Sequence, residues 1–254
     1  LWMENIFFNP NNFYFIIFII FFLGGVVKET IGVGLPTVTI GLLTFFFDIK
    51  ESIPLILLSV VVTNLLQAFE GNNFKIVIKD NLYFLIFSSL FIVPGIFLLK
   101  ILNSQIIIIF LAILIISNSV LYFLKKTINI NNHNSFSKQS FLGLLNGLVV
   151  GMTGIYSMPF IFLIQSLNYK KEKLIQLMGI TFFLYAVIQI ISFNLFNLYD
   201  VGIFMKSLIY CIPAILGVIF GRFIRKKLSE DLFKTLFNGM LLIIGTSIFI
   251  KNFL

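Results

Sequence analysis

Residues 24–36 read GGVVKETIGVGLP, a segment with four glycines and a closing proline that lies between two apolar runs. Glycine and proline both interrupt helices. The apolar run that follows, 35–47, would rise only about 20 Å as a helix, against roughly 30 Å for a hydrocarbon core. The segment therefore predicts a broken helix followed by a short one that enters a membrane without crossing it. Two ordinary turns are the alternative interpretation.

A matching segment, GLVVGMTGIYSMP, occupies residues 147–159. Placing Pro36 on Pro159 superimposes the two segments, and three further pairs then fall together: Gly24 with Gly147, Thr30 with Thr153 and, after a shift of one residue, Gln67 with Gln189. Internal symmetry of this kind is common in secondary transporters. Backbone that is unpaired at membrane depth needs protein or water around it, so paired breaks indicate a central binding site. We expect Pro36 and Pro159 to begin short helices whose N-termini approach one cavity.

The composition around these segments is that of a membrane protein. Of the 254 residues, 59% are apolar and 11% are charged, and the mean hydropathy is +1.06. A soluble protein cannot cover its surface with so little charge. The fold class is therefore all-α, a polytopic membrane bundle of two inverted, pseudo-symmetric halves with broken or re-entrant helices and about eight to ten segments. The apolar runs lie at 12–28, 35–47, 52–70, 80–99, 105–124, 139–151, 156–168, 173–195, 201–221 and 231–250.

The polar stretch between the fifth and sixth runs divides the chain. We expect an N-terminal transmembrane repeat at 1–124, a cytoplasmic linker at 125–138 and a C-terminal repeat at 139–254. Counting basic residues on alternate sides places 14 of the 18 on one side, which the positive-inside rule makes cytoplasmic. The chain is expected in the inner (plasma) membrane with both termini outside. Four basic residues fall on the outer side: Lys50, Lys100, Lys206 and Lys251.

The rare residue types exclude several kinds of site. The chain has one cysteine, Cys211, and one histidine, His133, which lies in the linker. Zinc sites, disulfide frameworks and Cys/His catalysis need partners that this sequence lacks, so no metal, no cofactor and no catalytic residue is expected. The net charge of +8 is assigned to membrane topology and not to nucleic acid.

Lys28 and Glu29 lie inside the first glycine-rich segment. An ion at membrane depth costs about 2.5–3.5 kcal/mol on insertion scales, so such residues are functional candidates. Lys28 would supply positive charge to an anion, together with the N–H groups at helix N-termini. The alternative is a cytoplasmic anchor with Glu29 as its neighbour at a helix end.

Polar side chains interrupt two otherwise apolar helices. Asn64 and Gln67 are three residues apart and share a helix face next to Thr63, and Gln189 with Ser192 repeats that spacing. Lining a binding site is one interpretation, and hydrogen bonding between helices is the other.

The basic cluster at 222–227 is expected to anchor topology and to bind anionic lipid, with no substrate role. The full set of expected substrate-binding residues is Lys28, Thr30, Gly32, Gly34, Thr63, Asn64, Gln67, Thr153, Gly154, Ser157 and Gln189.

The glycine-rich opening of each half resembles that of the TauE/SafE family of sulfite exporters. Gly24, Gly32, Gly34 and Pro36 occupy the family positions in the first half, and Gly147, Thr153, Gly154 and Pro159 occupy them in the second. The commoner family form has a tighter glycine run where residues 28–34 stand here. The resemblance implies export of a small anion such as sulfite or an organic sulfonate, driven by a proton or sodium gradient.

Two other classes of function stay open at this stage. One is an intramembrane enzyme acting on a lipid, although Lys28 and Glu29 are almost the whole inventory of buried ionisable groups. The other is a membrane subunit without transport activity of its own. No Gly-x-x-x-x-Gly-Lys-Ser/Thr sequence for ATP binding occurs, which agrees with a secondary mechanism.

Overall fold

The computed structural model describes residues 10–32, 34–125, 135–167, 169–227 and 229–253, and all regular structure in these ranges is helical. The first half contains α2 (Pro10–Ile31), α3 (Leu35–Leu43), α4 (Ile49–Ala68), α5 (Phe74–Asp80), α6 (Leu82–Ile101) and α7 (Ser104–Phe123). The second half contains α8 (Phe136–Thr153), α9 (Phe160–Ser166), α10 (Lys171–Leu195), α11 (Val201–Lys227) and α12 (Glu230–Phe253). The prediction of a helical membrane bundle is confirmed.

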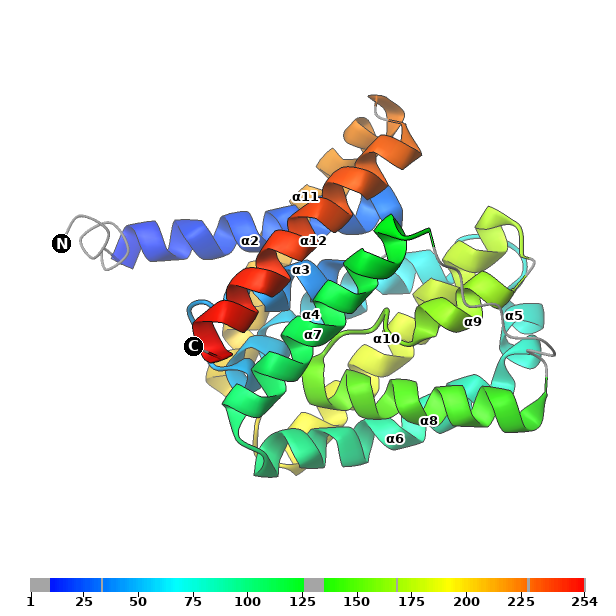
Figure 1. The fold of residues 1–254 in the computed structure, drawn as a ribbon, viewed down its shortest axis with the longest axis horizontal. Helices are drawn as coiled ribbons and strands as arrows, with labels where there is room; N and C mark the ends of the chain where they lie inside the picture. Colours follow the sequence, from blue (N-terminus) through cyan, green and yellow to red (C-terminus); the bar gives the residue numbers. More distant parts are fainter. Residues whose placement is uncertain (1–9, 33, 126–134, 168, 228, 254) are drawn as a thin grey trace.

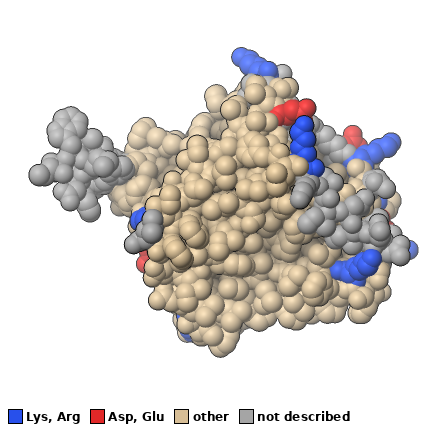
Figure 2. Space-filling view, viewed as in Figure 1, with Lys and Arg blue, Asp and Glu red and all other residues tan. Residues whose placement is uncertain are grey.

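Six helices are long and apolar enough to cross a membrane: α2, α4, α6, α7, α10 and α11. A shorter apolar stretch, Asn238–Phe253, lies in α12. Figure 2 shows a broad uncharged surface with most of the visible charged side chains at its upper and right margins. Uncharged surface of this extent suits contact with acyl chains, so the chain is a multi-pass membrane protein.

The two short helices begin where the prolines predict. α3 has nine residues, starts at Leu35 with Pro36 in its first turn, and is preceded by Gly34 at φ 115°. α9 has seven residues and follows Pro159. Helices of these lengths rise only about 14 and 10 Å, so neither crosses a hydrocarbon core alone. The prediction of short helices at Pro36 and Pro159 is confirmed, although both end earlier than the apolar runs suggest.

The first break is shorter than expected, because α2 continues through Gly24 and Gly25 as far as Ile31. These glycines serve close packing. A Cβ on Gly25 would lie 2.1 Å from the carbonyl oxygen of Ala214 in α11, and Gly217 of α11 meets the backbone of α2 as closely. The interruption is confined to residues 32–34, where Gly32 and Gly34 both have positive φ.

The second break is shifted in the same way. α8 continues through Gly147 and Gly151 to Thr153, and the interruption covers residues 154–159. A Cβ on Gly147 would lie 2.3 Å from the carbonyl oxygen of Ser88 in α6. Small residues at such positions allow helix backbones to approach each other closely in membranes.

The most extensive packing joins the two halves. α6 packs on α8, α2 on α11, α4 on α10 and α7 on α12, and Figure 1 shows α6 and α8 side by side along the lower edge of the molecule. Counted among the five apolar runs of each half, the first run (α2 or α8) packs on the fourth run of the other half (α11 or α6). The third and fifth segments of the halves pair with their own counterparts.

Two boundaries differ from the sequence-based expectation. A separate short helix, α5, precedes α6 where the sequence suggested a loop, and α8 begins at Phe136 within the expected linker 125–138. Residues 126–134, which include His133, lie outside the described ranges.

Candidate functional site

Lys28 lies near the end of α2 with only 4% of its surface exposed. Its Nζ donates to the main-chain oxygen of Thr63 at 3.0 Å and to Oε1 of Gln67 at 2.7 Å. Gln67 in turn donates from Nε2 to the oxygen of Ile175 at 3.0 Å. One lysine and one glutamine therefore connect α2, α4 and α10. A lysine ammonium has three N–H donors, and the two bonds found within the described chain leave one for another acceptor.

A cavity of about 500 Å³ opens beside this lysine. Residues of four helices, α2, α4, α10 and α11, line it, together with one residue that follows α2 and two that follow α4. The lining consists of Lys28, Glu29, Gly32, Val62, Thr63, Leu66, Gln67, Phe69, Glu70, Ile175, Ile215, Val218 and Arg222. Its size is within the usual range for small-molecule sites.

The charges of the cavity balance. Arg222 donates from Nε to Oε1 of Glu29 at 3.2 Å, with side-chain exposures of 60% and 19%. Lys28 and Glu70 supply the other two charges of the lining. Because Glu29 is held by Arg222, Lys28 is the buried cation that faces the cavity without a carboxylate bound to it in the described chain.

Four of the expected site residues meet at this cavity, namely Lys28, Gly32, Thr63 and Gln67. The other expected residues of the first half are absent from its lining. Thr30 directs its hydroxyl to the oxygen of Val26 in its own helix, and Gly34 caps α3. Asn64 is buried, and its Nδ2 donates to the oxygen of Val60 at 2.8 Å.

The expected residues of the second half lie at the second break. Gln189 accepts a hydrogen bond from the hydroxyl of Tyr156 and donates to the oxygen of Val150 at 2.9 Å. Thr153 ends α8, and Gly154 follows it at φ 69°. Ser157, also in the break, accepts from the first turn of α9 through its main-chain oxygen. None of these residues lines the cavity at Lys28.

Pro36 and Pro159 are also absent from that lining. The cavity therefore gives no support to the expectation that both short helices begin at one shared site.

Gln67 and Gln189 nevertheless make equivalent interactions. Each accepts from a side chain of a broken segment, Lys28 or Tyr156, and each donates to a main-chain oxygen of another helix. The sequence alignment pairs these two glutamines but gives no role to Tyr156, because tyrosines at helical spacing resemble ordinary packing residues.

The surroundings of Tyr156 are closed and aromatic. Its ring packs edge-on against Phe182 and Tyr185, at centroid distances of 5.5 and 5.6 Å. Asn146 donates to the hydroxyl of Tyr185 at 2.8 Å and accepts from the main-chain N–H of Phe160 at 2.9 Å. Asn146 thus satisfies the first N–H of α9 from a neighbouring helix, which holds the short helix inside the bundle.

Arg222 belongs to the basic cluster that sequence analysis gave no substrate role. In the structure it lines the cavity and pairs with Glu29. Sequence analysis also missed Glu70, which follows α4 directly. α11 packs on α2 through Gly217 and Gly221 and so brings Arg222 to Glu29, while the expectation that the cluster anchors topology and binds anionic lipid stays a prediction.

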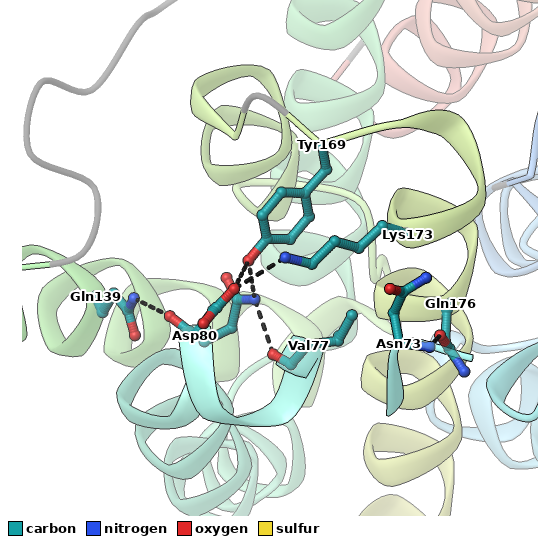
Figure 3. Close-up of polar contacts among 8 residues, drawn as sticks. Asn73, Val77, Asp80, Gln139, Tyr169, Lys173 and Gln176 are labelled. Atoms are coloured by element: carbon teal, nitrogen blue, oxygen red, sulfur yellow. Dashed lines mark hydrogen bonds and ion pairs between the residues drawn. The ribbon is translucent and has the colours of Figure 1, made fainter. Parts of the chain in front are cut away.

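A second polar cluster holds Asp80, the last residue of α5 (Figure 3). Oδ2 of Asp80 accepts from the hydroxyl of Tyr169 at 2.8 Å and from Nζ of Lys173 at 2.9 Å. Burial raises the pKa of Asp80, but the hydrogen bonds from Lys173 and Tyr169 outweigh it and leave this pKa below its usual value. Burial and the bond to Asp80 raise the pKa of Tyr169. The cluster joins α5 to the start of α10.

Comparison with known proteins identifies one family. The family model for the sulfite exporter TauE/SafE matches residues 17–248, nearly the whole chain. No curated protein and no solved structure matches. The family consists of transporters and not of enzymes, and the six apolar helices agree with that assignment. The chain belongs to the TauE/SafE family of sulfite exporters.

Proposed function

We propose that this protein is a secondary transporter that exports small inorganic or organic anions, of the sulfite or sulfonate type, across the plasma membrane. The observation that carries the proposal is the position of Lys28, a buried cation with one N–H donor unused in the described chain, at the wall of a cavity. A charge-assisted hydrogen bond to an anionic oxygen is about twice as strong as a neutral one.

The two halves, 1–124 and 139–254, are proposed as inverted repeats that alternate access to this site. Two observations support the proposal. The long helices of the halves pair in a symmetric pattern, and Gln67 and Gln189 make equivalent interactions. The cavity lies at the first break, whereas buried aromatic rings surround Tyr156 at the second. Opening of the second break would separate Tyr156 from Gln189 while the cavity at Lys28 closes.

A flux experiment on purified protein tests the proposed function. Proteoliposomes loaded with sulfite should release it faster than protein-free liposomes, and an imposed proton or sodium gradient should change the rate.

Lys28→Met should weaken anion affinity by roughly tenfold or more, because losing a hydrogen bond to a charged group costs about 1.5–3 kcal/mol. Lys28→Arg should retain part of the affinity, since its charge persists in a different geometry.

Lys75→Met is the matched control, because Lys75 lies on α5, exposed and away from the cavity lining. Its transport should equal that of the wild type. Wild-type kinetics for Lys28→Met at equal reconstitution would contradict the proposal and leave Lys28 as a topology anchor. Absence of flux with purified protein would favour a lipid-acting enzyme or a subunit that needs a partner.

A further inference from the structure

The cavity at Lys28 is lined by residues of both α4 and α11. α4 and α11 contact each other where the main-chain N–H of Leu58, in the middle of α4, donates to Oγ of Ser207, near the start of α11, at 3.3 Å. Farther along both helices, Val62 and Leu66 of α4 and Ile215 of α11 line the cavity. α2, which packs on α11, carries Lys28.

The apolar part of the lining is also part of the lipid-facing surface. Leu66 is 72% exposed, and Val62 and Ile215 are 38% and 36% exposed. All three lie within helices that are long and apolar enough to span the membrane. Exposed apolar side chains on such helices suit contact with acyl chains, so the apolar part of the lining lies on surface of the kind that faces lipid.

We propose that the cavity binds amphipathic anions, whose charged group contacts Lys28 while an apolar chain lies between α4 and α11 and reaches toward the bilayer. This inference rests on the proposed function and names the substrate class. The polar and apolar parts of the lining are arranged for such a ligand. Lys28 and Gln67 lie on the inner side, and the exposed Val62, Leu66 and Ile215 lie toward lipid.

Hydrogen-bond donors for an anionic group are present on two cations of the lining, although Glu29 and Glu70 balance their charge. Lys28 has a donor unused in the described chain, and Arg222 has guanidinium N–H groups beyond the Nε that binds Glu29. A ligand with a charged group and no apolar chain would leave the apolar part of the lining unfilled. A chain placed there removes its own apolar surface from water and fills the gap.

The test is a series of 1-alkanesulfonates, from methane- to butane- to hexanesulfonate, with the full chain in phosphatidylcholine nanodiscs. Titration calorimetry should show affinity rising about threefold to fourfold for each added CH₂ group, the value expected for burial of a methylene. Empty nanodiscs give the contribution of partition into lipid. Methanesulfonate and sulfite alone test the proposed function.

Val62→Trp and Ile215→Trp narrow the opening from opposite helices, so each should flatten the dependence on chain length. Leu65→Trp is the matched control. Leu65 is 39% exposed on α4, close to the 38% of Val62, but it is absent from the cavity lining. This variant should keep the wild-type dependence.

Binding of methanesulfonate with no gain from longer chains would overturn the inference and leave the proposed function standing. An equal chain-length gain in Val62→Trp, Ile215→Trp and Leu65→Trp would show that the chains dissolve in lipid, and it would overturn the inference as well. A wild type that binds no sulfonate and no sulfite would overturn both proposals together.

Discussion

Gln67 is the residue that holds Lys28 in place, because it accepts from the ammonium and is itself fixed by the oxygen of Ile175. Gln67→Ala should weaken anion affinity by roughly twofold to tenfold, less than Lys28→Met, since neutral hydrogen bonds contribute about 0.5–1.5 kcal/mol. A thermal-shift titration with sulfite measures the affinity of both variants. Asn64→Ala should lower anion affinity less than Gln67→Ala does, because Asn64 is buried but does not line the cavity. A larger loss for Asn64→Ala would contradict this assignment.

Asp80 predicts a dependence of stability on pH. Its pKa is lower in the folded protein than its usual value, so the folded state gains stability above the usual aspartate range and loses it as the pH falls through the folded pKa. Asp80→Asn should therefore melt below the wild type at pH 7, and the difference should shrink on acidification. The side chain is 36% exposed, so the effect at pH 7 should be under about 1 kcal/mol.

Melting curves of both proteins in one detergent, between pH 7 and the lowest pH at which both stay folded, measure this difference. A difference in melting temperature that stays constant over the range would show that the ion pair is not its source.

Single residues show what the sequence could predict about the site. Lys28 and Gln67 were identifiable, because ionisable and polar side chains are costly in an apolar helix. Tyr156 and Arg222 were not, since aromatic and basic residues have ordinary places in membrane proteins. Their roles depend on which helix lies opposite, and that follows only from the three-dimensional packing.

Glycine has two roles in the helices, and the sequence does not separate them. Gly32 follows the end of α2 and Gly34 caps the start of α3, as expected for a break, whereas Gly25 and Gly147 allow helix backbones to come into close contact. The prolines are less ambiguous, because a proline fits the first turn of a helix and disrupts its interior. The starts of α3 and α9 were therefore predicted correctly, and the extents of the breaks were not.

The close helix pairs lead to a stability prediction. Gly217→Ala places a Cβ 2.0 Å from the oxygen of Phe22, so α2 and α11 must separate, and the melting temperature should fall by several degrees. Gly239→Ala is the control. Nothing lies within 4 Å of the added Cβ, and alanine favours a helix over glycine by up to about 1 kcal/mol.

Purified variants in the same detergent allow this comparison by melting curves or by fluorescence size-exclusion after heating. Equal melting temperatures for Gly217→Ala and the wild type would show that the α2–α11 contact adjusts without cost.

At the scale of the whole molecule, three of the four basic residues that are expected on the outer side have a structural use. Lys50 donates to the oxygens of Lys100 and Leu102 at the end of α6, Lys100 donates to that of Phe196 after α10, and Lys251 donates to that of Phe45. Lysines favour such helix C-terminal carbonyls. Their presence on the expected outer side is therefore explained by capping.

Cysteine labelling tests the orientation. In a Cys211→Ser background, a cysteine at Asn72 should resist an impermeant thiol reagent in intact cells, and a cysteine at Gly202 should react. Both positions lie next to helix ends and are exposed. Labelling of permeabilised cells gives the maximum that each cysteine can reach. The reverse pattern in intact cells would show that the protein has the opposite orientation in the membrane, with both termini inside.

The pairing of α2 with α11 also constrains how the chain is made. About 190 residues separate Gly25 from Gly217, so at 5–20 residues per second the ribosome delivers α11 roughly 10–40 s after α2. α6 and α8 lie much closer in the chain and meet sooner. During that interval α2 resides in the bilayer without its glycine-matched neighbour α11. A nascent chain stalled before α11 should therefore be more open to membrane proteases than one released after it.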